Sequence, residues 1–217
     1  MNYFAFFDVD HTILKINSAG ALLRGAYKKG ILSKRRLISA CLLGLLYKLK
    51  IIDSERIIKK FASWLANYPV NEMESLCSEI VEKDLIPVIR PQIRNEIKKH
   101  QAQGAHLAIL SSAIAPICIP LAKHLEIPSV LCTELETDNH HYTGFPKGQF
   151  CYRKEKCNRM LRFLETNQIP PEHCYYYGDS MDDLSVLQSV GNPVCVNPGK
   201  NLAKLARKHN WKIYIWE

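Results

Sequence analysis

Five short apolar segments, spread along the chain, predict the strands of a β-sheet. They cover residues 3–7, 107–110, 129–132, 174–177 and 194–196. Each is brief and almost continuously apolar, which is typical of strands that are buried on both faces. The long gap after the first segment indicates that a separate unit is inserted there.

Segments with helical periodicity lie around the later strands. Apolar residues recur every three or four positions in residues 93–100, 117–125, 160–164 and 202–206. Strands that alternate with helices are typical of a parallel sheet with both faces covered. We therefore predict an α/β fold with a Rossmann-like, doubly wound parallel sheet. Residues 134–149, which are rich in turn-forming residues, are expected to form a loop or hairpin.

The stretch from residue 15 to residue 85 differs from the rest of the chain. It has no strand pattern but contains helical stretches, including residues 37–47 and 56–65. We interpret it as an all-helical insertion after the first strand. The predicted division is a core of residues 1–14 and 86–217 and an insertion of residues 15–85.

One helical stretch of the insertion has no charged residue. Residues 37–47 are uncharged, whereas residues 34–36, Lys48 and Lys50 are basic. A membrane-spanning helix needs roughly twenty apolar residues, so this stretch is too short. Two interpretations are open: a buried helix of the insertion, or a basic and apolar surface that contacts a membrane or a lipid-like substrate.

Composition places the chain among ordinary globular proteins. It has 217 residues, of which 47% are hydrophobic and 23% charged, so disorder and fibrous folds are excluded. Lys and Arg number 29 against 21 Asp and Glu, which gives a net charge of +8. This surplus favours anionic partners such as phosphate esters, nucleic acid or an acidic membrane face.

The eight cysteines do not form a metal-binding or disulfide pattern. No two are spaced as CxxC, and several, such as Cys132 and Cys195, lie in apolar segments. Buried free thiols in a reducing compartment are therefore expected. The first seven residues lack a basic leader and do not resemble a signal peptide. We predict a cytoplasmic protein.

Acidic residues follow two of the predicted strands. Asp8 and Asp10 come directly after the first strand, and Asp179, Asp182 and Asp183 follow the fourth. Ligand crevices of open α/β sheets lie at the carboxyl ends of the strands. Carboxylates gathered there would repel one another unless a hard cation neutralised them, and Mg²⁺ suits a few carboxylates together with water and phosphate.

Serine and lysine side chains add groups that could bind phosphate. Ser111 and Ser112 follow the second strand and precede a helix, where hydroxyls and free backbone N–H groups can hold an anion. Lys154 and Lys156 lie near the start of a later helix, from which an ammonium could reach a phosphate. Either signal alone is weak.

Taken in order, these motifs resemble the haloacid dehalogenase superfamily. DxDxT is matched by Asp8, Asp10 and Thr12, the serine motif by Ser111, the lysine motif by Lys156, and GDSxxD by Gly178, Asp179, Ser180 and Asp183. A helical insertion between the first two motifs resembles the cap of the phosphoserine-phosphatase-like subgroup. We favour Lys156 over Lys154 because its spacing from Cys151 fits the subgroup.

The resemblance implies a Mg²⁺-dependent phosphatase that acts on a small phosphate monoester. Asp8 would attack phosphorus and form an aspartyl-phosphate, and Asp10 would act as general acid and then base. The other implied roles are as follows: Asp8, the Asp10 carbonyl and Asp179 for Mg²⁺; Ser111, Ser112 and Lys156 for the phosphate; and Asp183 as a support for the metal's waters or for Lys156.

Two other classes of function remain open at this point. A phosphotransferase or phosphomutase would keep Asp8 but pass the phosphoryl group to an alcohol. A non-catalytic protein that binds nucleic acid or membrane would use the positive charge but leave the acidic clusters unexplained, so no nucleic-acid partner is expected. Asn17 occupies the position where phosphoserine phosphatases carry a glutamate that meets the substrate's amine, which weakens phosphoserine as the substrate.

Overall fold

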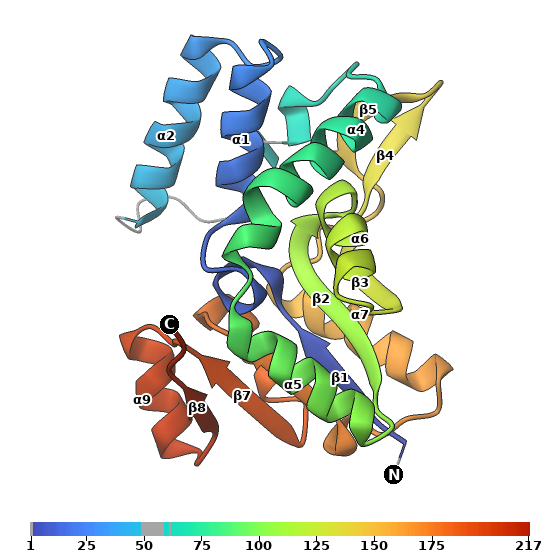
Figure 1. Ribbon diagram of the computed structural model, residues 1–217, viewed down its shortest axis with the longest axis vertical. Coiled ribbons are helices and arrows are strands. Elements are labelled where there is room, and N and C mark those ends of the chain that lie inside the picture. The colour runs from blue at the N-terminus through green and yellow to red at the C-terminus, as the bar shows by residue number, and fades with distance from the viewer. Residues whose placement is uncertain (1, 49–58, 61) are drawn as a thin grey trace.

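The computed structural model describes residues 2–48, 59–60 and 62–217. At its centre is a six-stranded sheet in the order β3-β2-β1-β6-β7-β8, with all neighbouring strands parallel (Figure 1). Its strands are β1 (Phe4–Phe7), β2 (His106–Ile114), β3 (Ser129–Thr133), β6 (Tyr175–Gly178), β7 (Asn192–Val196) and β8 (Lys212–Tyr214). The predicted α/β fold with a parallel sheet is confirmed.

The five predicted strands are all present, and the sheet contains one more. β8 was not predicted, because its three residues include Lys212 and are all at least partly exposed, so they form no apolar segment. β2 runs through Ser111 and Ser112 to Ile114, four residues beyond its predicted end. The segment predicted as a loop or hairpin forms the antiparallel pair β4 (Leu135–Asp138) and β5 (His141–Pro146).

Alternation along β1 divides its side chains between two hydrophobic cores. Ala5 and Phe7 pack into one core, and Phe4 and Phe6 into the other. The first core lies under α5 (Pro91–Ala102) and α6 (Ala115–His124). The second lies under α7 (Arg153–Thr166), α8 (Leu184–Leu187) and α9 (Lys200–Lys208). Helices therefore cover both faces, as a doubly wound sheet requires.

The insertion contributes α1 (Ser18–Lys28), α2 (Lys34–Lys48) and α4 (Val70–Ile80) (Figure 1). Of the predicted helical stretch 56–65, residues 56–58 and 61 lie outside the described part of the chain, and residues 59–60 and 62–64 are helical. Short turns of helix complete the fold at Val9–Ile13, Val81–Leu85, Ile86–Val88, Pro171–His173 and Met181–Asp183.

α1 packs closely on α4, and both join the first core. Gly25 leaves no room for a side chain, since a Cβ there would lie 2.5 Å from Cδ1 of Ile80. Leu22 of α1 and Met73 of α4 belong to the same continuous cluster as Phe7 of the sheet. The described part of the insertion therefore shares its hydrophobic core with the sheet, and the proposed boundaries at residues 14 and 86 stay a prediction.

α2 has a different environment. The expectation of a buried helix is wrong, because none of its described side chains is buried. It lies at the outer edge of the molecule with α1 beside it (Figure 1), and Leu37 is among the few α2 side chains that pack against the core. No helix in the described part of the chain is long and apolar enough to cross a membrane.

Candidate active site

The register of the central strands brings distant acidic residues to one edge of the sheet. Phe7 pairs with Tyr177, and the N–H of Asp8 donates to the Tyr177 carbonyl at 2.9 Å. β1 ends one residue before Asp8, and β6 ends one residue before Asp179. Since parallel strands all end at the same edge, residues about 170 positions apart in the sequence become neighbours.

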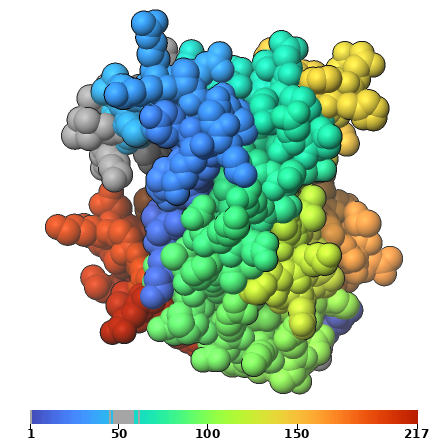
Figure 2. All heavy atoms as spheres, turned by 45° about the horizontal axis from the view of Figure 1, so that its top comes forward, coloured from blue at the N-terminus to red at the C-terminus, as the bar shows by residue number. Residues whose placement is uncertain are grey.

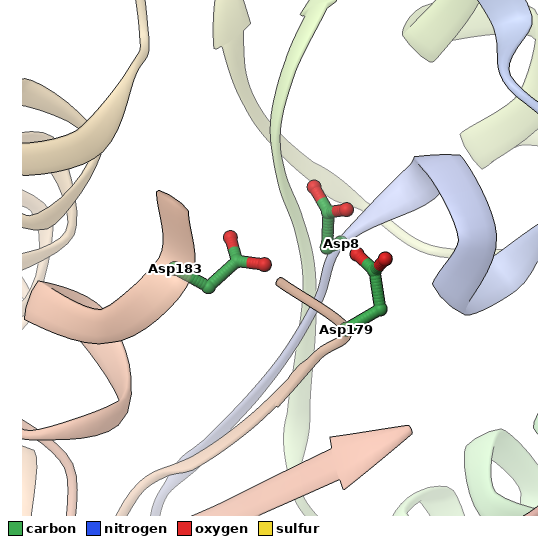
Figure 3. Close-up of side chains that lie close together, drawn as sticks. All are labelled: Asp8, Asp179 and Asp183. Atoms are coloured by element: carbon green, nitrogen blue, oxygen red, sulfur yellow. The ribbon is translucent and has the colours of Figure 1, made fainter. Parts of the chain in front are cut away.

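Three carboxylates converge at this edge. One oxygen from each of Asp8, Asp179 and Asp183 lies within 4.8 Å of the other two. Figure 3 shows Asp8 and Asp179 side by side at the strand ends, with Asp183 facing them from the following helical turn. Asp8 and Asp183 are buried, and Asp179 is partly buried. This is a concentration of negative charge that water cannot fully solvate.

Lys156 supplies positive charge to this cluster. Its Nζ lies 2.7 Å from Oδ1 of Asp8 and 2.6 Å from Oδ1 of Asp183, and the residue is only 3% exposed. It lies in the first turn of α7. Although burial opposes the charged form, the two carboxylates outweigh it and raise the pKa of Lys156 above its usual value.

Asp183 has no free hydrogen-bonding capacity on the side that faces Lys156. Its Oδ1 accepts from Lys156 and from the hydroxyl of Tyr176 at 2.6 Å, and its Oδ2 accepts from the N–H and hydroxyl of Ser180. Burial would raise its pKa, but these donors and the Lys156 charge hold the pKa below its usual value. Asp183 is therefore an ionised support for Lys156.

Asp8 and Asp179 are the carboxylates with oxygens to spare. Within the described residues, Asp179 accepts no hydrogen bond, and Asp8 accepts one through its side chain, from Lys156. Burial, with repulsion from Asp183, raises the pKa of Asp8 to about 7 despite Lys156. Burial, with repulsion from Asp8 and Asp183, raises the pKa of Asp179 to about 8. Carboxylate oxygens that no hydrogen-bond donor occupies fit a divalent cation such as Mg²⁺.

Asp10 is oriented by the start of the insertion. Its Oδ1 accepts from the backbone N–H of Ser18, and its Oδ2 accepts from Nδ2 of Asn17, both at 2.8 Å. Asn17 is also the N-cap of α1, because its Oδ1 accepts from the N–H of Gly20 at 3.1 Å. One amide thus caps the helix and holds the carboxylate. Burial raises the pKa of Asp10.

The two serines lie inside β2 and not at the start of a helix. Ser111 is buried, and its hydroxyl accepts from the N–H of Ala113 at 3.3 Å. The Ser112 carbonyl accepts from the hydroxyl of Thr133 at 2.9 Å. Because Phe7 pairs with Ile109, Ser111 lies near the level of Asp8 at the same edge. The described residues show no direct contact between either serine and the three acids.

Two residues near these motifs belong to other surroundings. Asp182 points toward α7, where its Oδ1 accepts from the Tyr152 hydroxyl and from Nε of Arg153. Lys154 is exposed and lines a surface cleft of about 580 Å³ between the β4–β5 hairpin and the segment that leads into α7. Lys156, not Lys154, is thus the lysine in contact with the acidic cluster.

Sequence reasoning missed Tyr176 as a member of the site, and it missed the contact between Asn17 and Asp10. Tyr176 was assigned only to a buried strand, but its hydroxyl reaches Asp183. The alternation of β6 could have indicated this, since Tyr176 must point away from the core that holds Tyr177. The contact of Asn17 with Asp10 joins positions seven apart across an irregular turn, and no periodic pattern signals it.

Comparison with known proteins agrees with this geometry. Residues 5–188 match the sequence model of the haloacid dehalogenase-like hydrolases. A histidinol-phosphatase of Neisseria meningitidis is 29% identical over 98% of this chain and 98% of its own.

Two solved structures are similar in fold. A Bordetella pertussis protein of unknown function superposes with a TM-score of 0.89 at 22% identity, over 99% of both chains. A substrate-bound phosphoserine phosphatase superposes with a TM-score of 0.72 at 16% identity, over 94% of this chain and 90% of its own. At these identities the two structures establish the fold alone.

Proposed function

Because its sequence matches that family over residues 5–188, the chain belongs to the haloacid dehalogenase-like hydrolases, and from this premise we propose that it is a phosphatase of small phosphate monoesters. The observation that carries the proposal is the acidic cluster of Asp8, Asp179 and Asp183 around one buried lysine. The name of the Neisseria relative supports the same reaction class.

Asp8 is the proposed nucleophile, and Asp10 the proposed general acid and base. An oxygen of Asp8 forms a bond to phosphorus while the bond to the leaving oxygen breaks, and Asp10 gives that oxygen a proton. Water then attacks the aspartyl-phosphate, Asp10 takes its proton, and phosphate leaves with Asp8 restored. The raised pKa of Asp10 suits a group that must first hold and then release a proton.

Lys156, Ser111 and Ser112 are proposed to bind the transferring phosphoryl group. The ammonium of Lys156 already lies 2.7 Å from the nucleophile, so a phosphate that reaches Asp8 meets a positive charge. The Ser111 hydroxyl and the backbone N–H of Ser112 add donors at the same edge of the sheet. Fixed donors aimed at developing charge are usually the largest single contribution to catalysis.

The residues fit a Mg²⁺ ion, which would be held by Asp8, the backbone carbonyl of Asp10 and Asp179. When bound, the ion supplies positive charge that favours the ionised form of the nucleophile and offsets the charge of the phosphate. Asp183 keeps its proposed role as the residue that orients Lys156. The carboxylates of Asp8 and Asp179 have oxygens available for this purpose, whereas those of Asp183 are occupied.

The substrate is proposed to be a small phosphorylated metabolite. Asn17 hydrogen-bonds Asp10 and caps α1, so its neutral amide is committed to the protein and does not offer a carboxylate to a substrate amine. Phosphoserine is therefore a weaker candidate than phosphate esters whose leaving group needs no such partner. The panel to compare consists of histidinol phosphate, sugar phosphates, lysophospholipid phosphates and phosphoserine.

Release of inorganic phosphate from this panel and from a generic aryl phosphate tests the proposal. We expect turnover with Mg²⁺ and none with EDTA. Asp8→Asn should reduce turnover to background, and Asp10→Asn should lower it by roughly 100-fold or more. Asp182→Asn is the matched control, because Asp182 lies one residue from Asp183 but contacts α7 instead of the cluster.

Three results would contradict parts of this account. An active Asp8→Asn protein would exclude the covalent route, and full activity in EDTA would exclude the metal. If added alcohols capture the phosphoryl group in preference to water, the enzyme is a phosphotransferase on the same scaffold.

A further inference from the structure

α2 carries apolar side chains that the protein does not bury. Ile38 is 58% exposed and Leu42 is 54% exposed, and Cys41 between them is also exposed. Figures 1 and 2 show α2 at the outer edge of the molecule, with α1 along one side of it. These three side chains lie within one turn of each other on the helix, so they form a single exposed apolar strip.

The exposed face of α2 is basic as well as apolar. Lys34, Ile38 and Leu42 are spaced four residues apart and so lie along one face of the helix. Arg35 is exposed at the same end. Exposed apolar side chains beside cations are the two kinds of group through which a protein surface contacts anionic lipid.

The chain's entire positive surplus lies in the segment that contains this helix. Residues 11–52 include nine Lys and Arg and no Asp or Glu, whereas the remaining residues include 20 Lys and Arg and 21 Asp and Glu. The net charge of +8 is thus +9 in residues 11–52 and −1 elsewhere. The segment that carries the exposed apolar strip of α2 is therefore also the segment that carries the positive surplus.

We propose that α2 docks the protein on an anionic lipid surface. The helix would lie parallel to the membrane, with Ile38 and Leu42 in the headgroup region and Lys34, Arg35 and Arg36 against lipid phosphates. At 15 residues α2 is about 22 Å long, which suits lying on a bilayer and not crossing it.

Charge disfavours a second copy of the chain as the occupant of this face. The uncharged stretch is basic at both ends, with residues 34–36 before it and Lys48 and Lys50 after it. Two copies that met through this segment would bring like charges together, because residues 11–52 carry +9 in each copy. Lipid phosphates neutralise such charges.

Cys41 makes the docking measurable in the native protein. It is the exposed cysteine, and the other seven are buried, so a maleimide fluorophore that responds to polarity should label it selectively. We expect its emission to shift to the blue and brighten with vesicles containing a third phosphatidylserine, but not with phosphatidylcholine alone. Adding 0.5 M NaCl should reverse much of the change, because salt screens exposed charges.

Vesicle flotation of unlabelled variants separates the two contributions. Replacing Lys34, Arg35 and Arg36 with Gln should lower binding about 100-fold, since each surface cation contributes about 1 kcal/mol, or about five-fold. The matched control replaces Lys200, Lys204 and Lys208 of α9, which removes the same charge from another exposed helix and should change binding little.

A second comparison, between one variant of α2 and one control variant, tests the contribution of the apolar side chains. The double variant Ile38→Gln and Leu42→Gln should lose most binding, whereas Ile119→Gln, at 58% exposure on α6, should not. If the α9 control loses as much vesicle binding as the α2 charge variant, binding depends on net charge alone, and the proposal is overturned. Absence of vesicle binding also overturns it, and a dimer in light scattering would then identify a second copy on this face. Turnover of a soluble aryl phosphate should be unchanged throughout, so this result is independent of the phosphatase assay.

Discussion

Replacing Lys156 with Met would remove the cation on which the charge balance of the site depends. The ammonium contacts Asp8 at 2.7 Å and Asp183 at 2.6 Å in a buried position, and Met keeps much of the apolar stem. Removing one partner of a buried ion pair costs about 3–5 kcal/mol, because the remaining charge is buried without compensation. We expect a loss of that size in urea denaturation at pH 7.5 without divalent cations.

The loss should depend on pH in a definite direction. The pKa of Asp8, already raised to about 7, would rise further without the ammonium. A carboxyl group whose pKa is higher in the folded state than in the unfolded state binds protons more tightly when folded. Stability of the variant therefore falls as pH rises from about 4 toward the folded pKa, and the penalty should be smaller at pH 5.5 than at pH 8.5.

Lys154→Met provides the matched control. Lys154 lies two residues earlier in the same helix but is exposed, so its loss should change the unfolding free energy by less than about 0.5 kcal/mol. If Lys156→Met is as stable as Lys154→Met, Lys156 is not a buried counter-ion. If its penalty is the same at pH 5.5 and pH 8.5, the reasoning about Asp8 is wrong.

Three further predictions concern the acidic cluster, Asn17, and His100, a buried residue of α5 whose ring contacts the hydroxyls of Tyr3 and Tyr177. Protons compete with a cation for Asp8 and Asp179, whose pKa values are raised to about 7 and about 8. Mg²⁺ should therefore raise the melting temperature more at pH 8.5 than at pH 5.5. Equal shifts at the two pH values would contradict the proposed Mg²⁺ site. Asn17→Ala should lose about 1 kcal/mol of stability through the helix cap, and Asn17→Asp should keep the cap. Both should lower turnover by displacing Asp10, and a fully active Asn17→Asp enzyme would argue against that role. Burial lowers the pKa of His100 to about 4. The unfolded protein therefore binds this proton more tightly, and protonation should destabilise the fold by up to about 3 kcal/mol as pH falls from 6.5 to 4. In urea titrations, the stability advantage of the native protein over His100→Gln should shrink across that range.

The sheet could be predicted from the sequence because its strands are buried on both faces. Five of the six strands in the sheet consist mainly of apolar or aromatic residues, so each appears as a short apolar segment. β8 could not be predicted, because it is an edge strand whose residues are partly exposed and it is held by backbone pairing with β7. Its position depends on contacts that no local pattern encodes.

The acidic residues of the site could be predicted because strand ends in a parallel sheet share an edge. What the motif could not show is how each oxygen is used. Asp183 proved to be committed to Lys156 and Tyr176, and Asp182 to Arg153, although the two aspartates are adjacent in sequence. The distinction arises from the helical turn after β6, which sends consecutive side chains in different directions.

The environment of α2 was the other feature that the sequence left open, because it too depends on residues that are distant in the chain. An uncharged helix is buried only if neighbours cover it on every side, and the fold supplies α1 on one side. Whether a helix is covered depends on the whole chain's topology. The local sequence could therefore suggest both interpretations but could not choose between them.

The insertion's place in the chain determines what holds Asp10, the residue proposed to transfer the proton. It leaves the sheet directly after β1, so its first helix begins beside the strand end that carries Asp8 and Asp10. The N–H of Ser18 and the amide of Asn17 then fix the carboxylate of Asp10. Any movement of α1 relative to the sheet must stretch these two hydrogen bonds, because Asp10 belongs to the core and its partners belong to the insertion. The proposed general acid is therefore held in position by the start of α1, the first helix of the insertion.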